Sequence, residues 1–383
     1  MSDHDKLDVA ICGAGPVGMA LAALLARRGM PGARIALIDA KPLASAMADP
    51  RSIALSYGSR MLLEEVGAWP VPATAIHEIH ISRRGHLGRS LIERSEHDVP
   101  ALGYVTRYGD LVGSLAAVCE RAGVVTIRPA RVVAQLEHAD GVSLTLDDAR
   151  TLEAALLVQA EGGVFGEQDH KATARTRDYR QTAVIARVSA SGAIAHRAFE
   201  RFTEEGPLAL LPQEGSDGLQ YALVWCVRPE TADTLLQLDD AAFLARLGEA
   251  FGTRLGRFGA VSARASYKLG LNAIDAATAR SVAIGNAAQT LHPVAGQGLN
   301  LGLRDAAVLA RLLARGATPA MLAAFSDARR ADRGTTVGLT DAMARAFAGT
   351  GPAQAVLGLS LGLLDAVAPA RALLAELMMF GRR

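Results

Sequence analysis

The chain of 383 residues lacks the features of several common protein classes. Its three cysteines, Cys12, Cys119 and Cys226, have no CxxC spacing and no accompanying histidine pattern. This argues against a disulfide framework and a zinc site, and it favours a reducing compartment. Aromatic residues make up only 4% of the chain, and the formal net charge is +1. A nearly neutral chain without a basic, aromatic-rich stripe is not expected to bind nucleic acid.

The sequence also lacks a recognisable targeting or membrane-spanning segment. The uncharged run over 9–26 is interrupted between residues 13 and 18 by three glycines and a proline, where a membrane helix would be continuous. Residues 1–8 have no basic region of the kind that opens a signal peptide. We therefore expect a cytoplasmic protein.

The order of the expected elements indicates an α/β fold with a β-rich insertion. Residues 9–12 are typical of a strand, 16–28 of a helix and 34–38 of a second strand, which together have the size of one βαβ unit. Asp110 is expected to cap a helix that ends at Arg121. Three later β-rich runs predict a separate sheet: 182–188, 208–211 and 221–227. A strand and a helix then restore the α/β pattern: 281–284 and 301–315.

The first motif is Gly13-Ala-Gly15-Pro16-Val-Gly18, which matches the dinucleotide fingerprint G-x-G-x-x-G between a strand and a helix. The first glycine permits a tight turn, the second lets the backbone approach a pyrophosphate, and the third lets the helix pack close to the strand. The N–H groups and dipole of the helix N-terminus would then stabilise the negative charge. We expect a dinucleotide site here.

Asp39 supports this hypothesis, because it follows the second strand at the point where a carboxylate hydrogen-bonds a ribose hydroxyl in such folds. The alternative is a glycine-rich turn that serves only helix–strand packing. The complete strand, turn, helix and acid favour the dinucleotide site. Cys12, beside the turn, is interpreted as a small buried apolar residue.

A second glycine-rich turn occupies the stretch 284–305, IGNAAQTLHPVAGQGLNLGLRD. Pro293, Gly296 and Gly298 form a turn without bulky side chains directly before a helix that is expected to begin near Leu299. Backbone N–H groups at such a helix start would favour a negatively charged ligand. Arg304 and Asp305 are interpreted as a structural surface or capping pair, and His292 as a packing or turn residue.

This stretch resembles the second FAD-binding signature of the flavin-dependent aromatic hydroxylases, in particular their ubiquinone-biosynthesis branch. Two further segments, Arg51–Ser59 and Gly206–Pro212, are similar to segments of the same branch. The resemblance covers nearly the whole chain. It implies that Gly285 and Asn286 lie near the ribityl and pyrophosphate groups of FAD, that residues 296–300 border the isoalloxazine ring, and that Arg51 faces the flavin or the active site.

From the two motifs and the resemblance together, we expect these residues to bind the cofactor: Gly13, Gly15, Pro16, Gly18, Asp39, Arg51, Gly285, Asn286, Pro293, Gly296, Gly298, Leu299 and Asn300. The resemblance further implies an FAD-dependent monooxygenase that hydroxylates the ring of a polyprenylated phenol with O2, through a flavin C4a-hydroperoxide and with NAD(P)H as reductant. No catalytic side chain and no metal ligand is assigned. A ubiquinone-synthesis assembly and peripheral contact with the inner face of the membrane are left open as partners.

Two departures from the family pattern concern cofactor handling. Asn286 stands where the wider family usually has aspartate, although asparagine can still bond a ribityl hydroxyl. The segment 159–166 aligns with the family's Asp-Gly motif, but Glu161 replaces the aspartate, Gly162 is followed by glycine, and the usual serine and arginine are missing. In the family this motif takes part in binding both FAD and NAD(P)H, so the second departure bears on NAD(P)H binding and on catalysis.

The expected architecture is a Rossmann-like FAD-binding domain with an inserted β-rich substrate domain and a helical C-terminus. The FAD-binding domain is assigned to 1–70, 100–176 and 272–330, the substrate domain to 71–99 and 177–271, and the helical region to 331–383. The apolar stretch 353–380 is interpreted as packed helices, with a membrane-surface or partner-docking element as the alternative. His77, His80 and His86 are interpreted as solvated histidines and not as metal ligands.

Two other functions remain open. The altered Asp-Gly motif motivates a flavin-binding but non-hydroxylating component of a quinone-synthesis assembly. A different flavin reaction, such as isoprenoid reduction or halogenation, is the other alternative. Trp69 and Trp225 are isolated, so halogenation is disfavoured.

Overall fold

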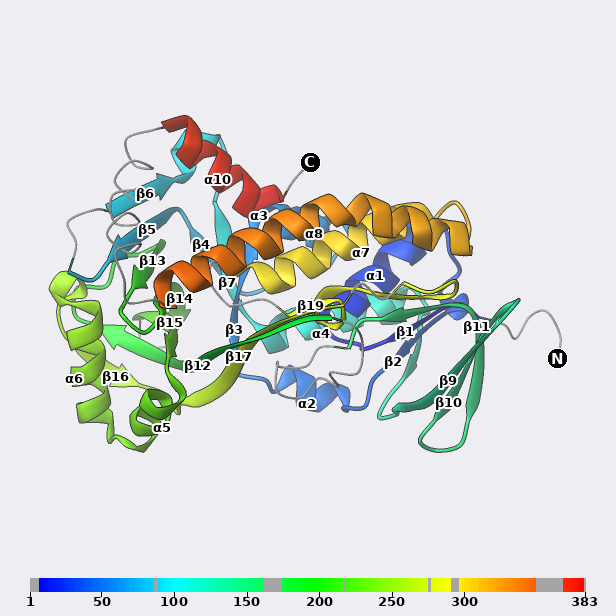
Figure 1. Ribbon diagram of the computed structural model, residues 1–383, viewed down its shortest axis with the longest axis horizontal. Coiled ribbons are helices and arrows are strands. Elements are labelled where there is room, and N and C mark those ends of the chain that lie inside the picture. Colours follow the sequence, from blue (N-terminus) through cyan, green and yellow to red (C-terminus); the bar gives the residue numbers. More distant parts are fainter. Residues whose placement is uncertain are drawn as a thin grey trace.

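The computed structural model describes residues 7–85, 89–161, 174–215, 218–274, 277–290, 296–348 and 368–381. The molecule is elongated, with a large sheet at each end and a small sheet between them (Figure 1). The expected mixed α/β fold with a β-rich insertion and a helical C-terminus is confirmed. The assignment of residue ranges to domains stays a prediction.

The seven-stranded sheet contains the first βαβ unit. Its order is β8-β2-β1-β11-β10-β9, and β18 pairs with β11. The strands β8, β2, β1, β11 and β18 are parallel, whereas β10 and β9 form an antiparallel hairpin. The strands are Leu7–Cys12 (β1), Ile35–Ile38 (β2), Val125–Ile127 (β8), Val132–His138 (β9), Gly141–Leu146 (β10), Thr151–Gln159 (β11) and Ser281–Ala283 (β18). Residues 9–12 are all buried, as expected for a parallel strand covered on both faces.

The nine-stranded sheet has the order β19-β17-β12-β15-β14-β13-β5-β6, and β16 pairs with β12. Its strands are Glu78–Arg83 (β5), Arg89–Glu93 (β6), Ala174–Ala190 (β12), Arg197–Phe202 (β13), Pro207–Gly215 (β14), Gly218–Val227 (β15), Phe258–Val261 (β16), Ala265–Ile274 (β17) and Gln289–Thr290 (β19). One face packs on α5 (Pro229–Gln237) and α6 (Asp240–Phe251) through a core that includes Phe199, Trp225 and Phe243.

The other face of this sheet is turned toward the small sheet. The small sheet has the order β3-β7-β4, with β3 at Ser52–Ser56, β7 at Gly103–Arg107 and β4 at Ala73–Ile76. Ala198 of β13 and Leu211 of β14 pack against Ile76 and Val105 of the small sheet. The two sheets therefore share an apolar contact.

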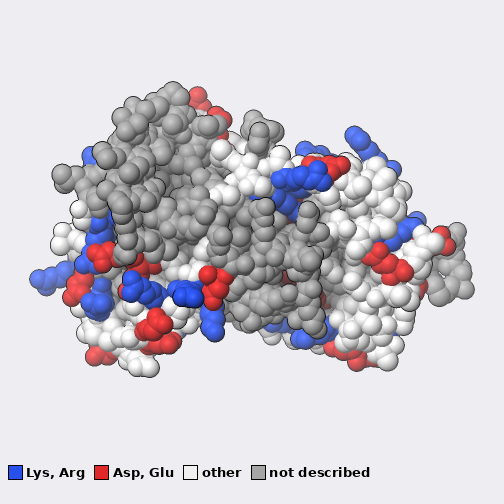
Figure 2. All heavy atoms as spheres, in the orientation of Figure 1, with Lys and Arg blue, Asp and Glu red and all other residues white. Residues whose placement is uncertain are grey.

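The helices cover the sheets and connect the two ends of the molecule. They are Pro16–Arg27 (α1), Leu43–Met47 (α2), Tyr57–Glu65 (α3), Tyr108–Arg121 (α4), Gln297–Leu313 (α7), Pro319–Ala348 (α8) and Ala368–Phe380 (α10), with short 3-10 turns at Gly32–Arg34 (η1), Arg94–His97 (η2), Thr253–Leu255 (η4) and Gly285–Ala287 (η5). α7 and α8 pack side by side along the molecule (Figure 1). On the face drawn in Figure 2, Lys and Arg side chains are interspersed with Asp and Glu side chains.

Three expected helix boundaries are corrected. α4 begins at Tyr108, so Asp110 lies in the first turn and does not cap the helix. α7 begins at Gln297 and not near Leu299 or Leu301, because Gly296 adopts the left-handed conformation directly before it. α8 begins at Pro319, before the start of the helical region expected over 331–383, since a proline is well tolerated in the first turn of a helix.

The described part of the C-terminal stretch packs on the protein. In α10, Ala375 and Met379 join Ile92 and Leu102 in one apolar cluster, and Phe380 meets Tyr57 edge to face with ring centroids 6.1 Å apart. This agrees with the interpretation as packed helix, while residues 353–367 lie outside the described residues. Among the residues that the structure describes, no helix is both long enough and apolar enough to cross a membrane.

Candidate functional site

The N-terminal turn is so tightly packed that its first and third glycines leave no room for a side chain. Gly13 has a φ of +105°, and a Cβ placed on it would lie 2.5 Å from the carbonyl carbon of Ala160. A Cβ on Gly18 would lie 2.0 Å from the carbonyl oxygen of Gly13. The amide of Gly13 donates to the carbonyl of Ile38 at 2.7 Å. The turn is therefore fixed against β1, β2 and the end of β11.

The start of α1 offers backbone donors to a ligand. Gly15 caps the helix and Pro16 is its first residue, so no cap side chain satisfies the N–H groups of the first turn. Asp39 lies at the end of β2, and its carboxylate accepts hydrogen bonds of 2.8 Å from the amides of Ala14 and Lys41. The structure thus brings the fingerprint and its acid together, and the ribose contact of Asp39 stays a prediction.

Arg51 lies beside this turn. Its guanidinium donates to the carboxylate of Asp49 at 2.7–3.0 Å and lies over the rings of Tyr108 and Tyr267, 4.9 Å and 5.6 Å from their centroids. Burial alone would raise the pKa of Asp49, but the hydrogen bonds and charge of Arg51 outweigh it and lower that pKa. The hydroxyl of Tyr108 is 3.3 Å from the position of a Cβ on Gly15.

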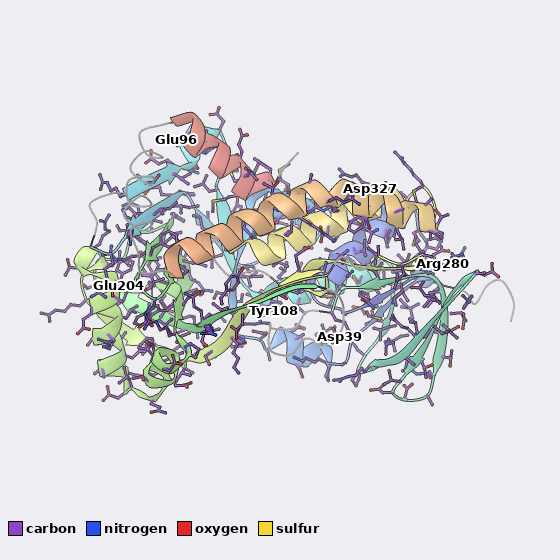
Figure 3. The ribbon with its side chains drawn as sticks, viewed as in Figure 1. Asp39, Glu96, Tyr108, Glu204, Arg280 and Asp327 are labelled. Carbon is purple, nitrogen blue, oxygen red and sulfur yellow. The ribbon has the colours of Figure 1, made fainter. Side chains whose placement is uncertain are left out.

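Tyr108 is a site residue that the sequence did not reveal. It lies near the middle of the molecule, and Arg51 connects it to Tyr267 of the long strand β17 (Figure 3). Tyr108 belongs to no glycine motif and stands at the start of a helix, so its only sequence signal is an aromatic residue after β7.

The second turn is held by Asn300. Its Oδ1 accepts from the amide of Ser56 at 2.8 Å and from the hydroxyl of Ser59 at 2.7 Å. Its Nδ2 donates to the carbonyls of Ala54 at 3.1 Å and Gly296 at 2.7 Å. The Asn300 side chain is therefore fully engaged in hydrogen bonds within the protein. Only the backbone of Asn300 is left to make the expected contact with the cofactor.

The structure also places Gly296 and Leu299 of the second motif. Gly296 has a φ of +60°, and a Cβ on it would lie 3.3 Å from the Cβ of Ala54. Leu299 is partly buried against the main core. Pro293 lies outside the described residues, as does His292.

A buried ionic cluster supports the turn at Gly285. The carboxylate of Asp305, with 0% exposed surface, accepts from Arg329 at 2.7 Å and Arg333 at 2.9 Å. It also accepts from the amide of Gly285 at 3.3 Å and from the side chain of Gln289 at 3.2 Å. Four donors can compensate the desolvation of one carboxylate.

The interpretation of Arg304 and Asp305 as a surface or capping pair is wrong. Asp305 is fully buried in the cluster, and Arg304 is half-buried and bonds Asp332 at 3.3 Å. Adjacent positions on a helix point in different directions, so the two side chains have different partners.

The two glycine motifs meet in the structure. A Cβ on Gly302 of α7 would lie 2.7 Å from the Cγ2 of Val17 in α1 and 3.0 Å from the Cα of Gly285. A Cβ on Gly298 would lie 3.9 Å from the Oδ1 of Asn286. The starts of α1 and α7 and the turn η5 are thus neighbours. Two uncapped helix starts joined by glycine backbone fit an elongated, negatively charged dinucleotide such as FAD.

The altered Asp-Gly motif begins beside the first turn. The backbone of Glu161 lies against Gly13, and nearby protein atoms and the charge of Asp39 raise the pKa of the Glu161 carboxyl. Residues 162–166 of this motif lie outside the described residues.

The cysteines have a structural role. Burial raises the pKa of Cys119 to about 12, and burial followed by the charge of Glu161 does the same for Cys12. Both thiols are therefore un-ionised at neutral pH, which confirms that Cys12 acts as a small buried residue.

The expectation that His80 is a solvated histidine is wrong. It is 3% exposed in β5, with its ring 5.6 Å from that of Phe199 and its Nε2 against Arg254. Burial, followed by the charge of Arg254, lowers the pKa of His80 to about 4. Over the described ranges, no three His, Cys, Asp or Glu side chains are grouped to hold a metal ion.

Comparison with known proteins agrees with this geometry. Residues 6–337 match the FAD binding domain family. The chain is 33% identical to ubiquinone hydroxylase UbiL of Rhodospirillum rubrum, over 96% of this chain and 89% of that protein. It is 28% identical to 3-demethoxyubiquinol 3-hydroxylase of Escherichia coli, over 81% of this chain and 80% of that protein.

Solved structures show the same fold at lower identity. The p-nitrophenol 4-monooxygenase PnpA of Pseudomonas putida superposes with a TM-score of 0.76 at 18% identity, over 99% of both chains. PqsL of Pseudomonas aeruginosa gives a TM-score of 0.73 at 21% identity, over 93% of this chain and 99% of that chain. The chain therefore belongs to the FAD binding domain family, within the flavin-dependent aromatic hydroxylases, and is an FAD-dependent monooxygenase.

Proposed function

We propose that this monooxygenase hydroxylates the ring of a polyprenylated phenol in ubiquinone biosynthesis, with O2 as oxidant and NAD(P)H as reductant. One oxygen atom of O2 enters the ring, the other leaves as water, and NAD(P)H supplies the two electrons. The observation that carries the proposal is the meeting of the two glycine motifs at Val17, Gly285 and Gly302, in a chain whose relatives include ubiquinone hydroxylases.

The residues of this chain would hold FAD in an extended form. The first turn, at Gly13, Gly15 and Gly18, would receive the pyrophosphate at the start of α1, and Asp39 would bind the ribose. The backbone over 296–300 would border the isoalloxazine ring at the start of α7. When bound, FAD supplies the transfer of electrons and the activation of O2.

The substrate would lie between the flavin and the nine-stranded sheet. Ala198 and Leu211 pack against the small sheet, so this side of the sheet is apolar, and apolar surroundings suit a prenyl chain. An apolar wall also excludes water, which protects reactive oxygen species from unproductive decay. The FAD-binding domain would then be discontinuous, with the substrate domain inserted into it.

The direct test uses purified protein and 2-prenylphenol. We expect a yellow protein with one FAD per chain, faster NADPH oxidation when the phenol is present, and a product heavier by one oxygen atom. In cells that lack the chain, mass spectrometry should find a quinone precursor short by one ring oxygen. Bound FAD together with NADPH oxidation that no prenyl phenol stimulates would contradict the proposal.

A non-hydroxylating flavoprotein of a quinone-synthesis assembly is the second candidate. Glu161 favours it, because this residue replaces the aspartate of a motif that handles NAD(P)H in the family. Restoring the aspartate distinguishes the two functions. Substrate-stimulated NADPH oxidation that appears only in Glu161→Asp would support the second candidate, and stimulation in the natural protein would exclude it.

A further inference from the structure

Glu200 of β13 places a carboxyl on the face of the nine-stranded sheet that is turned toward the small sheet. Side chains two positions apart on a strand share a face. Ala198, two residues before Glu200, packs against Ile76 and Val105 of the small sheet. Phe199, between them, points to the opposite face and joins the core under α5 and α6.

The surroundings of Glu200 are apolar. Its strand neighbours are Ala209 of β14 and Ile81 of β5, and the buried thiol of Cys226 on β15 is the titratable group that interacts with it. The carboxyl of Glu200 forms no hydrogen bond and no ion pair with the described residues. Glu200 as a whole residue is half-buried.

The same sheet face extends to the second flavin turn. Leu211 and Gln213 follow Ala209 at alternate positions of β14 and therefore share its face. The Oε1 of Gln213 accepts from the hydroxyl of Ser52 in β3 at 2.9 Å. Ala54, two residues further along β3, lies against Gly296 at the start of α7. Glu200 is thus connected to the turn at Gly296 through residues of β14 and β3 on this side of the sheet.

We propose that the carboxylate of Glu200 accepts the hydroxyl proton of the phenolic substrate. The O–H bond of the phenol breaks, a new O–H bond forms on Glu200, and the electron pair stays on the phenolate oxygen. A phenolate releases electron density into its ring, which favours the transfer of an electrophilic oxygen to a ring carbon. This inference rests on the proposed function and assigns its first catalytic side chain.

The acid–base properties of Glu200 suit this role. Burial raises the pKa of Glu200 to about 7. Below this value the carboxyl is protonated and cannot accept a proton, and above it the carboxylate is available. A general base is most effective when its pKa lies near the working pH. The thiol of Cys226, whose pKa burial and then Glu200 raise well above its ordinary value, stays neutral over this range.

The test compares the holoenzyme with Glu200→Gln and Glu200→Asp, using 2-prenylphenol between roughly pH 5 and 9. In the natural protein, product formed per NADPH consumed should rise with pH through an apparent pKa near 7. Glu200→Gln should lose this rise and at least about 100-fold in hydroxylation rate at pH 7. It should keep the FAD affinity. Glu200→Asp should retain a displaced pH dependence.

Glu214→Gln is the matched control, because Glu214 is an exposed glutamate on the adjacent strand β14. It should behave as the natural protein does. A Glu200→Gln variant that binds FAD and keeps the natural pH profile would overturn the role of Glu200 alone. Absence of any phenol-stimulated oxidation in the natural protein would instead overturn the proposed function.

A measurement on the unaltered protein covers the case in which Glu200→Gln does not fold. Without O2 and NADPH, the absorbance band of the bound phenolate reports the ionisation of 2-prenylphenol directly. Free phenols of this kind ionise near pH 10. The bound probe should ionise well below that value, whereas a bound probe that stays neutral up to about pH 9 would refute the proton transfer.

Discussion

The first fingerprint glycine shows how single positions determine the flavin turn. Gly13 and Gly29 both have positive φ values, +105° and +98°, but a Cβ on Gly13 would overlap Ala160 whereas Gly29 has open space around it. An L-residue in the left-handed region costs about 1–2 kcal/mol. Gly29→Ala should carry only this cost.

We predict that Gly13→Ala lowers the free energy of unfolding by about 1–3 kcal/mol more than Gly29→Ala, because it adds overpacking to the backbone strain. Denaturant unfolding of the two variants measures the difference, and FAD titration should show weaker binding only in Gly13→Ala. Equal losses in the two variants would show that the close packing at Ala160 is unimportant.

The buried carboxylate of Asp305 gives a second prediction. Asp305→Ala removes the carboxylate that Arg329 and Arg333 share and leaves Arg329 with Asp332 alone, and breaking a buried ion pair in this way costs about 3–5 kcal/mol. Chemical denaturation should show this loss, together with weaker FAD binding because Gly285 loses its acceptor. Asp327→Ala is the control, since Asp327 is exposed and its pair with Arg330 is worth at most about 1 kcal/mol. Equal stability of the two variants would contradict the prediction.

Sequence spacing alone was enough to find the residues whose role depends on neighbours close in the sequence. The fingerprint glycines and Asp39 are recognisable because a turn between a strand and a helix requires them at fixed spacing. Tyr108, Glu200 and the partners of Asp305 follow no spacing rule. Each gains its role from elements distant in the sequence, so only the fold could reveal it.

At the scale of elements, hydrophobic periodicity identified the strands of the first βαβ unit and three strands of the nine-stranded sheet, β12, β14 and β15. It did not identify the small sheet β3-β7-β4 or the strands β5, β6, β13 and β17, and the errors have physical causes. The start of α7 was placed too late because Gly298 and Asn300 are weak helix formers. Asn300 is stabilised there by four hydrogen bonds to Ser56, Ser59, Ala54 and Gly296. These tertiary contacts override the local preference.

The packing of α10 leads to a third prediction. Met379 is 3% exposed and contacts the cluster of Ile92 and Leu102, whereas Met61 on α3 is 48% exposed. Met379→Ala should lower the free energy of unfolding by about 2–5 kcal/mol, and Met61→Ala should change it by less than about 0.5 kcal/mol. If thermal unfolding of Met379→Ala matches that of Met61→Ala, α10 does not contribute to the stability of the fold.

At the scale of the whole molecule, FAD should stabilise the protein by bridging the two glycine motifs. A ligand that binds only the folded state adds about 2.7 kcal/mol at 100 times its Kd. Thermal unfolding of FAD-free protein should therefore shift upward as FAD is added. FMN lacks the second phosphate and the adenosine that the turn at Gly13 and Gly15 would hold, so it should stabilise less at equal concentration. Equal effects of FMN and FAD would argue against that turn as the pyrophosphate site.

The contact of Gly285 and Gly302 with Val17 also determines when the chain can bind its cofactor during synthesis on the ribosome. The N-terminal turn and the start of α1 are synthesised first, yet Gly285 and Gly302, which pack against Val17, follow more than 260 residues later. A nascent chain should thus be unable to retain the flavin until α7 has left the exit tunnel. Cofactor capture would then be one of the last events in the maturation of this enzyme, and chains arrested before α7 should emerge colourless.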